Sequence, residues 1–280
     1  MNRTLFLGLI LVSFALGCSQ VNMGSIGQMA QETFSAARPL SDEEEYYVGR
    51  AVAARILSTY PLLENRRLTE YVNFVGKTVA LHSDRPVTYG GYHFAILNSN
   101  EINAFSCPGG TIFITKGMIH AVRNEDELAA VLTHEVAHIN HRDGVSAIQK
   151  ARLTQVATLI GSQAAQRYTP AQLSQLVGVF EGSVDDVFKT IVVNGYGRSQ
   201  EYHADESALS FLWRAGYNPS ALKDFLERLL SQGQSSGGGI MKTHPATADR
   251  IERIKREMPS VNVDAFAFQI RARRFQEALR

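Results

Sequence analysis

The sequence predicts an α+β protein that is mainly helical, with a small β-sheet packed beside one particular helix. Three observations support this fold class. Hydrophobic residues recur with a helical period in several stretches of the 280-residue chain. Residues 92–97 and 111–115 are β-branched and aromatic, as strands are. Two histidines one helical turn apart lie in a well-capped helical stretch at residues 124–139.

The N-terminal region predicts a lipid-anchored protein of the bacterial cell envelope. Residues 1–17 are typical of a signal peptide, because their apolar run is too short to span a bilayer. Small residues before Cys18 resemble a lipobox, which implies a lipid on the Cys18 thiol, and residues 18–40 look like a tether. In lipoproteins of enterobacterial type, Ser19 after that cysteine implies the outer membrane. The alternative is an ordinary signal peptide with a chance cysteine.

Composition narrows the classes of function. The chain has 28 Lys plus Arg against 27 Asp plus Glu, with no long block of either sign. We therefore expect no nucleic-acid partner and no polybasic membrane patch. Its two cysteines, Cys18 and Cys107, are too few for a disulfide scaffold or a cysteine-rich structural zinc site. The charge balance and the cysteine count do not determine the oligomeric state, and they assign no role to Cys107.

The first half of the domain is predicted to be two helices. Ser41 and Glu44 form a capping-box pattern before the first helical period, which Pro61 ends. A second amphipathic helix is expected around residues 68–79.

Two strands and a central helix follow. The strands at residues 92–97 and 111–115 are separated by a Pro-Gly-Gly turn signal at residues 108–110. Asn124, followed by three acidic residues, is a good N-cap for the next helix.

The second half is predicted to be helical. Residues 145–190 are amphipathic and too polar for a membrane span, and residues 199–215 form a further helix. The Gly/Ser-rich segment Ser231–Gly239 is either a gate or a linker. We expect the folded domain at residues 41–260 and a charged helical tail at 261–280.

The histidine pair belongs to a His-Glu-x-x-His motif, His134 to His138. Positions four apart lie on one face of a helix, so two imidazoles there can hold one zinc ion. Glu135 is rotated off that line and can activate an attacking water. The alternative, two solvated histidines, fits poorly with the capped amphipathic context.

A catalytic zinc site needs a third protein ligand. The candidate is Glu201, 63 residues after His138, on a later helix that can return across the site. Asp205 lies one turn further on the same face, where its carboxylate can accept the free ring N–H of a zinc-binding histidine. His141 and His203 are expected to support the site from outside or to lie on the surface.

The ordered motifs resemble the HtpX, BepA and LoiP group of zinc metallopeptidases, a minigluzincin family. The likeness covers residues 40–260, and LoiP-type lipoproteins are the nearer match because the chain has no membrane spans after its signal and no C-terminal repeat domain. It rests on four pieces: Glu101 to Phe105 with Pro108-Gly109-Gly110; His134 to His138; Arg198 with Glu201, Ala204 and Asp205; and Thr243-His244-Pro245.

The resemblance implies a zincin-like fold and one zinc ion per chain on His134, His138 and Glu201. Glu135 would be the general base, and Asp205 would support a ligand. It also implies that His244 lies near the metal, where it either caps zinc at rest or stabilises the oxyanion. Arg198 is a further candidate for holding that negative charge.

These features predict a zinc endopeptidase that cleaves misfolded cell-envelope proteins, a quality-control role. The alternative is a lipid-anchored, non-proteolytic assembly factor or chaperone for outer-membrane proteins. The sequence does not identify the substrate. The substrate backbone is expected to pair with one predicted strand, formed by Thr111, Ile112, Phe113, Ile114 and Thr115.

Overall fold

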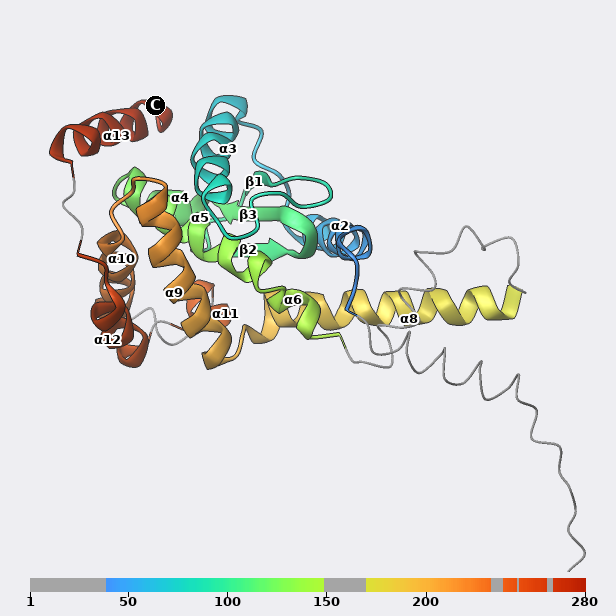
Figure 1. Cartoon of the computed structure of the whole chain (residues 1–280). Coiled ribbons are helices and arrows are strands. Elements are labelled where there is room, and N and C mark those ends of the chain that lie inside the picture. Colours follow the sequence, from blue (N-terminus) through green and yellow to red (C-terminus); the bar gives the residue numbers. More distant parts are fainter. Residues whose placement is uncertain (1–38, 149–169, 233–238, 246, 261–263) are drawn as a thin grey trace, which may run out of the picture.

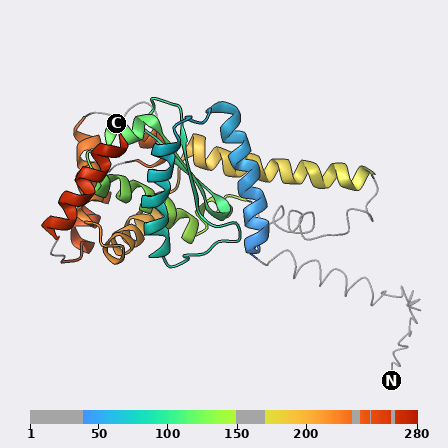
Figure 2. The ribbon, with the colours of Figure 1, turned by 90° about the horizontal axis from the view of Figure 1, so that it is seen from above.

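A computed structural model of the chain describes residues 39–148, 170–232, 239–245, 247–260 and 264–280. In this part of the chain a three-stranded sheet lies between helices (Figure 1), and one long helix, α8, projects from the body in both views (Figure 2). The expected signal peptide, the lipidation site Cys18 and nearly all of the tether lie outside the described residues, as does most of the Gly/Ser-rich segment.

The helices have the following bounds. They are α2 (Asp42–Thr59), α3 (Arg66–Leu81), η1 (Pro108–Gly110), α4 (Lys116–Ala121), α5 (Glu125–Asn140), α6 (Asp143–Ser146), α8 (Pro170–Phe188), η3 (Lys189–Asn194), α9 (Arg198–Arg214), α10 (Ser220–Ser231), α11 (Ile240–Thr243), α12 (Ala248–Glu257) and α13 (Ala265–Ala278).

The predicted helix starts are confirmed at α2 and α5. Ser41 caps α2 in a reciprocal capping box with Glu44. Asn124 caps α5, where its side chain accepts a hydrogen bond from the backbone N–H of Glu127. Both caps satisfy N–H groups that a helix leaves unpaired at its first turn.

The sheet has the order β1-β3-β2, with strands β1 (His93–Leu97), β2 (Ala104–Cys107) and β3 (Thr111–Thr115). Strand β3 pairs in parallel with β1 and in antiparallel with β2. The expectation that the strand Thr111–Thr115 binds substrate by strand addition is therefore wrong, because β3 is central and both of its edges are already paired. The sequence reading also missed β2, which is an edge strand of this sheet.

Alternation along the strands builds two hydrophobic cores. Ile112 and Ile114 of β3 point to the same side and pack in the core that contains α3 and α5. Phe113, between them, points the other way and packs with Phe105 in the core that contains α2 and α8. The sheet thus supports α5 from one face, and every residue from Glu125 to Ile139 is buried.

The C-terminal helix belongs to the same folded unit. Phe275 of α13 is 2% exposed and packs in the core with α3 and α5. Arg274 forms an ion pair with Glu125, and Arg271 lies 3.1 Å from Asp126, so α13 is tied to the first turn of α5.

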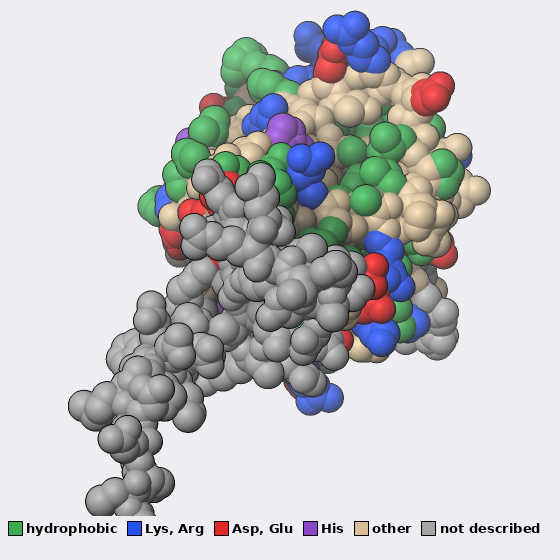
Figure 3. Space-filling view, turned by 90° about the vertical axis from the view of Figure 1, so that its right-hand side faces the viewer, with side chains coloured by type: hydrophobic (Ala, Val, Ile, Leu, Met, Phe, Trp, Pro, Cys, Tyr) green, Lys and Arg blue, Asp and Glu red, His purple; other side chains and the backbone are tan. Residues whose placement is uncertain are grey.

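The surface of the described residues carries charges of both signs. Figure 3 shows Lys and Arg interspersed with Asp and Glu on one face, together with polar and hydrophobic side chains. Among the described helices, none is both long and apolar enough to cross a membrane.

Candidate metal centre

Helix α5 brings two imidazoles to one point. His134 and His138 lie one turn apart, are 4% and 1% exposed, and their Nε2 atoms are 3.2 Å apart. Two uncharged ring nitrogens gain nothing from facing each other at this distance unless a cation or a proton lies between them.

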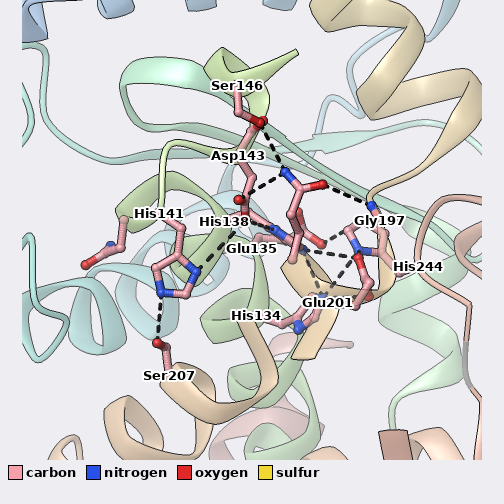
Figure 4. Close-up of polar contacts among 12 residues, drawn as sticks. His134, Glu135, His138, His141, Asp143, Ser146, Gly197, Glu201, Ser207 and His244 are labelled. Carbon is pink, nitrogen blue, oxygen red and sulfur yellow. Dashed lines mark hydrogen bonds and ion pairs between the residues drawn. The ribbon is translucent and has the colours of Figure 1, made fainter. Parts of the chain in front are cut away.

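Helix α9 supplies the carboxylate that the sequence predicted. It packs against α5, and its fully buried Ala204 and Ala208 belong to the same hydrophobic core as α5. Glu201, 1% exposed, places Oε1 3.4 Å from His138 Nε2 and Oε2 3.5 Å from His134 Nε2. Residues 63 positions apart in the chain therefore meet in space, as Figure 4 shows.

The end of α11 adds a fourth donor. His244, 3% exposed, places Nδ1 2.9 Å from Glu201 Oε1 and 3.3 Å from His134 Nε2. One ligand atom from each of His134, His138, Glu201 and His244 lies within 4.8 Å of the others. The other ring nitrogen of His244 lies 3.5 Å from Glu135 Oε1.

The spacing of these donors fits a tetrahedral ion. Zinc–ligand bonds of about 2.0–2.1 Å at the tetrahedral angle place two ligands about 3.3 Å apart. The separations between His134 Nε2 and His138 Nε2, and between His134 Nε2 and His244 Nδ1, are 3.2 and 3.3 Å. The cluster therefore fits a metal site, and its three nitrogens and one oxygen suit zinc.

Each helix histidine has its own carboxylate partner. His134 Nδ1 lies 3.1 Å from Asp205 Oδ1, the kind of contact predicted for Asp205. His138 Nδ1 donates to Asp143 Oδ2 at 2.7 Å, and Gln200 of α9 donates to the other oxygen of Asp143. Because a carboxylate only accepts, His138 Nδ1 carries the proton and its Nε2 lone pair faces the metal position, and the Asp205 carboxylate lies where it favours the same tautomer of His134.

Asp143 was missed by the sequence reading. It follows Arg142, whose left-handed backbone (φ 59°) turns the chain back toward α5. An aspartate five residues after His138 has no helical register with it, so the pattern alone gave no signal.

Arg250 was also missed. This arginine of α12 is 3% exposed and contacts both Glu201 and Asp205. Burial alone would raise the pKa of both carboxyls, but Arg250 is the strongest opposing influence, and with neighbouring histidines it holds the pKa of Asp205 below and that of Glu201 well below the ordinary value.

Arg198, which the sequence predicted to support the metal site, lies away from the ligand cluster. Its side chain is exposed at the start of α9 and lines a pocket beside Glu201, but it has no ion pair or hydrogen bond with the described cluster. His141 bonds to Ser207, and His203 is exposed, so both lie outside the cluster.

Glu135 is fully buried, and neither of its carboxylate oxygens has a hydrogen-bond partner among the described residues.

Two further features border the cluster. Tyr196, which the sequence did not predict, stacks its ring on the His138 ring with centroids 4.0 Å apart. A small apolar pocket opens next to Glu135 and His244. Its apolar lining consists of Val131, Leu222, Phe225, Leu226 and Ile240.

A His-Glu-x-x-His helix joined by a glutamate from a second helix defines the metallopeptidase class of site. A profile of peptidase family M48 matches residues 64–258. The chain belongs to peptidase family M48, as the resemblance implied.

Comparison with curated proteins gives similar relatives. The chain is 29% identical over 223 residues to the beta-barrel assembly-enhancing protease of Escherichia coli (strain K12), covering 78% of this chain and 44% of that protein. It is 24% identical over 265 residues to metalloprotease LoiP of the same organism, covering 91% and 96%. It is 31% identical over 163 residues to the mitochondrial metalloendopeptidase OMA1 of Schizosaccharomyces pombe, covering 58% and 45%. The chain thus spans about half the length of several relatives that it matches.

Proposed function

We propose that this chain is a zinc-dependent endopeptidase that hydrolyses misfolded or unassembled proteins of the bacterial cell envelope. The observation that carries the proposal is the convergence of His134, His138 and Glu201 beside the buried Glu135, whose carboxylate has no hydrogen-bond partner among the described residues. A buried carboxylate without a hydrogen-bond partner is costly and needs an explanation, and an attacking water supplies one.

His134, His138 and Glu201 would hold the zinc ion. When bound, zinc supplies Lewis-acid chemistry that polarises a peptide carbonyl and makes water more acidic. Glu135 takes the proton of the attacking water and passes it to the leaving nitrogen. Asp205 and Asp143 keep both imidazoles in the tautomer that faces the ion.

His244 acts as a cap at rest in this proposal. A catalytic zinc site keeps one position open, whereas His244 Nδ1 fills the fourth corner of the described cluster. The ring must therefore leave that corner before a peptide carbonyl can approach. Because His244 Nε2 lies 3.5 Å from Glu135 Oε1, a small movement of the ring would leave it beside the reacting groups, so the cap and the oxyanion role would be successive rather than exclusive.

The substrate backbone would pair with the chain just before β2, at Ile102, because the four residues of β2 itself are buried. Strand β2 is an edge of the sheet and runs beside α5. Just before it, the carbonyl of Ile102 accepts a hydrogen bond from Ile240 N at 2.7 Å, so a short stretch of backbone already binds there. Backbone pairing gives affinity with little sequence preference, which suits misfolded clients. The apolar pocket beside Glu135 accepts an apolar side chain next to the cleaved bond.

The location follows from the N-terminal sequence. Cleavage before Cys18 and acylation of its thiol would anchor the enzyme in the outer membrane, facing the periplasm. The name of one relative, a beta-barrel assembly-enhancing protease, supports an envelope role. Radiolabelled palmitate should enter the wild type but not Cys18→Ala, and equal labelling would exclude this anchor.

The experiment for the activity compares the zinc-loaded wild type with Glu135→Gln on unfolded casein. Both proteins should bind zinc, because Glu135 is not a ligand, and only the wild type should cleave. Equal cleavage would overturn the proposal. Full complementation of a deletion strain by Glu135→Gln would instead favour a non-proteolytic assembly factor.

A further inference from the structure

Arg250 connects three parts of the metal centre through one guanidinium. Its Nε and Nη2 donate to the two oxygens of Asp205 at 2.8 and 2.7 Å. Its Nη1 lies 2.6 Å from Glu201 Oε2 and donates to the Pro245 carbonyl at 3.0 Å. Thr247 caps α12 and fixes the turn from which the Arg250 side chain extends back to the site.

These contacts divide the two oxygens of Glu201 between two tasks. Oε2 lies 2.6 Å from Arg250 Nη1 and 3.5 Å from His134 Nε2, whereas Oε1 lies 2.9 Å from His244 Nδ1 and 3.4 Å from His138 Nε2. A carboxylate with both oxygens free can bind a metal ion through one oxygen or through both. Binding through both oxygens raises the coordination number of the ion by one. The guanidinium 2.6 Å from Oε2 competes with an ion for that oxygen.

We propose that Arg250 is a positioning residue that restricts Glu201 to bind the metal through Oε1 alone. This inference rests on the proposed function in one respect: it takes the bound ion to be the catalytic zinc. If Glu201 binds through one oxygen, the ligand position that His244 now fills is the one left for substrate. The same side chain holds Asp205 beside His134 and also binds the backbone just after His244. Arg250 therefore helps to orient three candidate metal ligands: His134, Glu201 and His244.

Lysine cannot replace this arrangement. The guanidinium presents a rigid planar fork of donors, and here it contacts both oxygens of Asp205, Glu201 and a carbonyl at once. An ammonium on a flexible stem keeps the charge but cannot reach all of these partners. Arg250→Lys therefore removes the positioning while preserving the charge that two buried carboxylates require.

Arg228 offers a matched control. It is also a mostly buried arginine that pairs with both oxygens of one carboxylate, Glu127, and donates to a backbone carbonyl, Ala121 O. Arg228→Lys should therefore lose similar packing and stability without touching the metal centre.

The test measures the metal site of the full-length protein. In the zinc-loaded wild type, X-ray absorption should show four ligands with a single carboxylate oxygen. Arg250→Lys should raise the zinc dissociation constant, measured against a competing chelator, by about 10–100-fold. The Co²⁺-substituted variant should lose visible absorption intensity as Glu201 adds its second oxygen. Arg228→Lys should match the wild type in both metal readouts.

Two results would overturn the inference. One is a wild-type site in which Glu201 contributes both oxygens, a measurement that needs no variant to fold. The other is a folded Arg250→Lys with wild-type zinc affinity and Co²⁺ spectrum. Failure of the proposed function is separate, because it would appear as a wild type that binds zinc but does not cleave.

Discussion

Asp143 accepts a hydrogen bond from the ring of His138 at 2.7 Å, and this contact fixes which ring nitrogen faces the metal. The partner comes from α6, immediately after α5, whereas the partner of His134 comes from α9. Two unrelated segments therefore orient two imidazoles of one motif.

Asp143→Asn should weaken zinc binding by about tenfold, because an amide is a poorer acceptor than a carboxylate for the ring N–H. The measurement is a chelator competition at constant pH. Asp84→Asn is the control, since Asp84 is an exposed aspartate paired with Arg214. Equal zinc affinity in all three proteins would show that the Asp143 contact is dispensable.

His244→Ala should make the metal centre easier to reach. Removing the fourth donor opens one corner of the cluster, so a hydroxamate inhibitor that binds zinc should associate about tenfold faster. Zinc affinity should fall, because one donor is lost. Stopped-flow fluorescence gives the association rate, and an unchanged rate would contradict the role of His244 as a cap at rest.

Cys107 should be unreactive in the folded protein. Burial, aided by the negative charge of Glu135, raises the pKa of its thiol above the ordinary range, so the thiol stays protonated at pH 8–9. Iodoacetamide should label Cys107 of a Cys18→Ser chain at least about tenfold more slowly before denaturation than after it. Rapid labelling of the native chain near pH 8 would show that the site is more open.

The C-terminal helix should contribute to the stability of the domain. Phe275→Ala should lower the free energy of unfolding by about 3–5 kcal/mol, because this ring fills the core beside α5. Phe266→Ala in the same helix should change it by less than about 0.5 kcal/mol, because that ring is 70% exposed. Urea denaturation measures both. Similar small effects would mean that α13 is not part of the cooperative core.

Features set by local sequence were the most predictable. The caps Ser41 and Asn124 act within one turn, and strand β3 has the predicted bounds Thr111–Thr115. The pair His134 and His138 follows from helical geometry alone. Glu201 required the family resemblance or a search for a third ligand, because its partner helix is distant in the chain.

Features set by tertiary packing were not predictable. Strand β2 has four residues, all buried, so it shows no alternation. The strand order that makes β3 central depends on how β2 folds back. Arg250 lies in a charged stretch that looks like a solvated helix face, and only the fold shows that it points at two carboxylates.

The most direct test of the central claim is the zinc content of the wild type and Glu201→Ala at equal free zinc. We predict one tightly bound zinc per wild-type chain and an affinity at least about tenfold weaker in Glu201→Ala. Equal occupancy and equal affinity in the two proteins would contradict the claim that a carboxylate of α9 completes the site begun by the two histidines of α5.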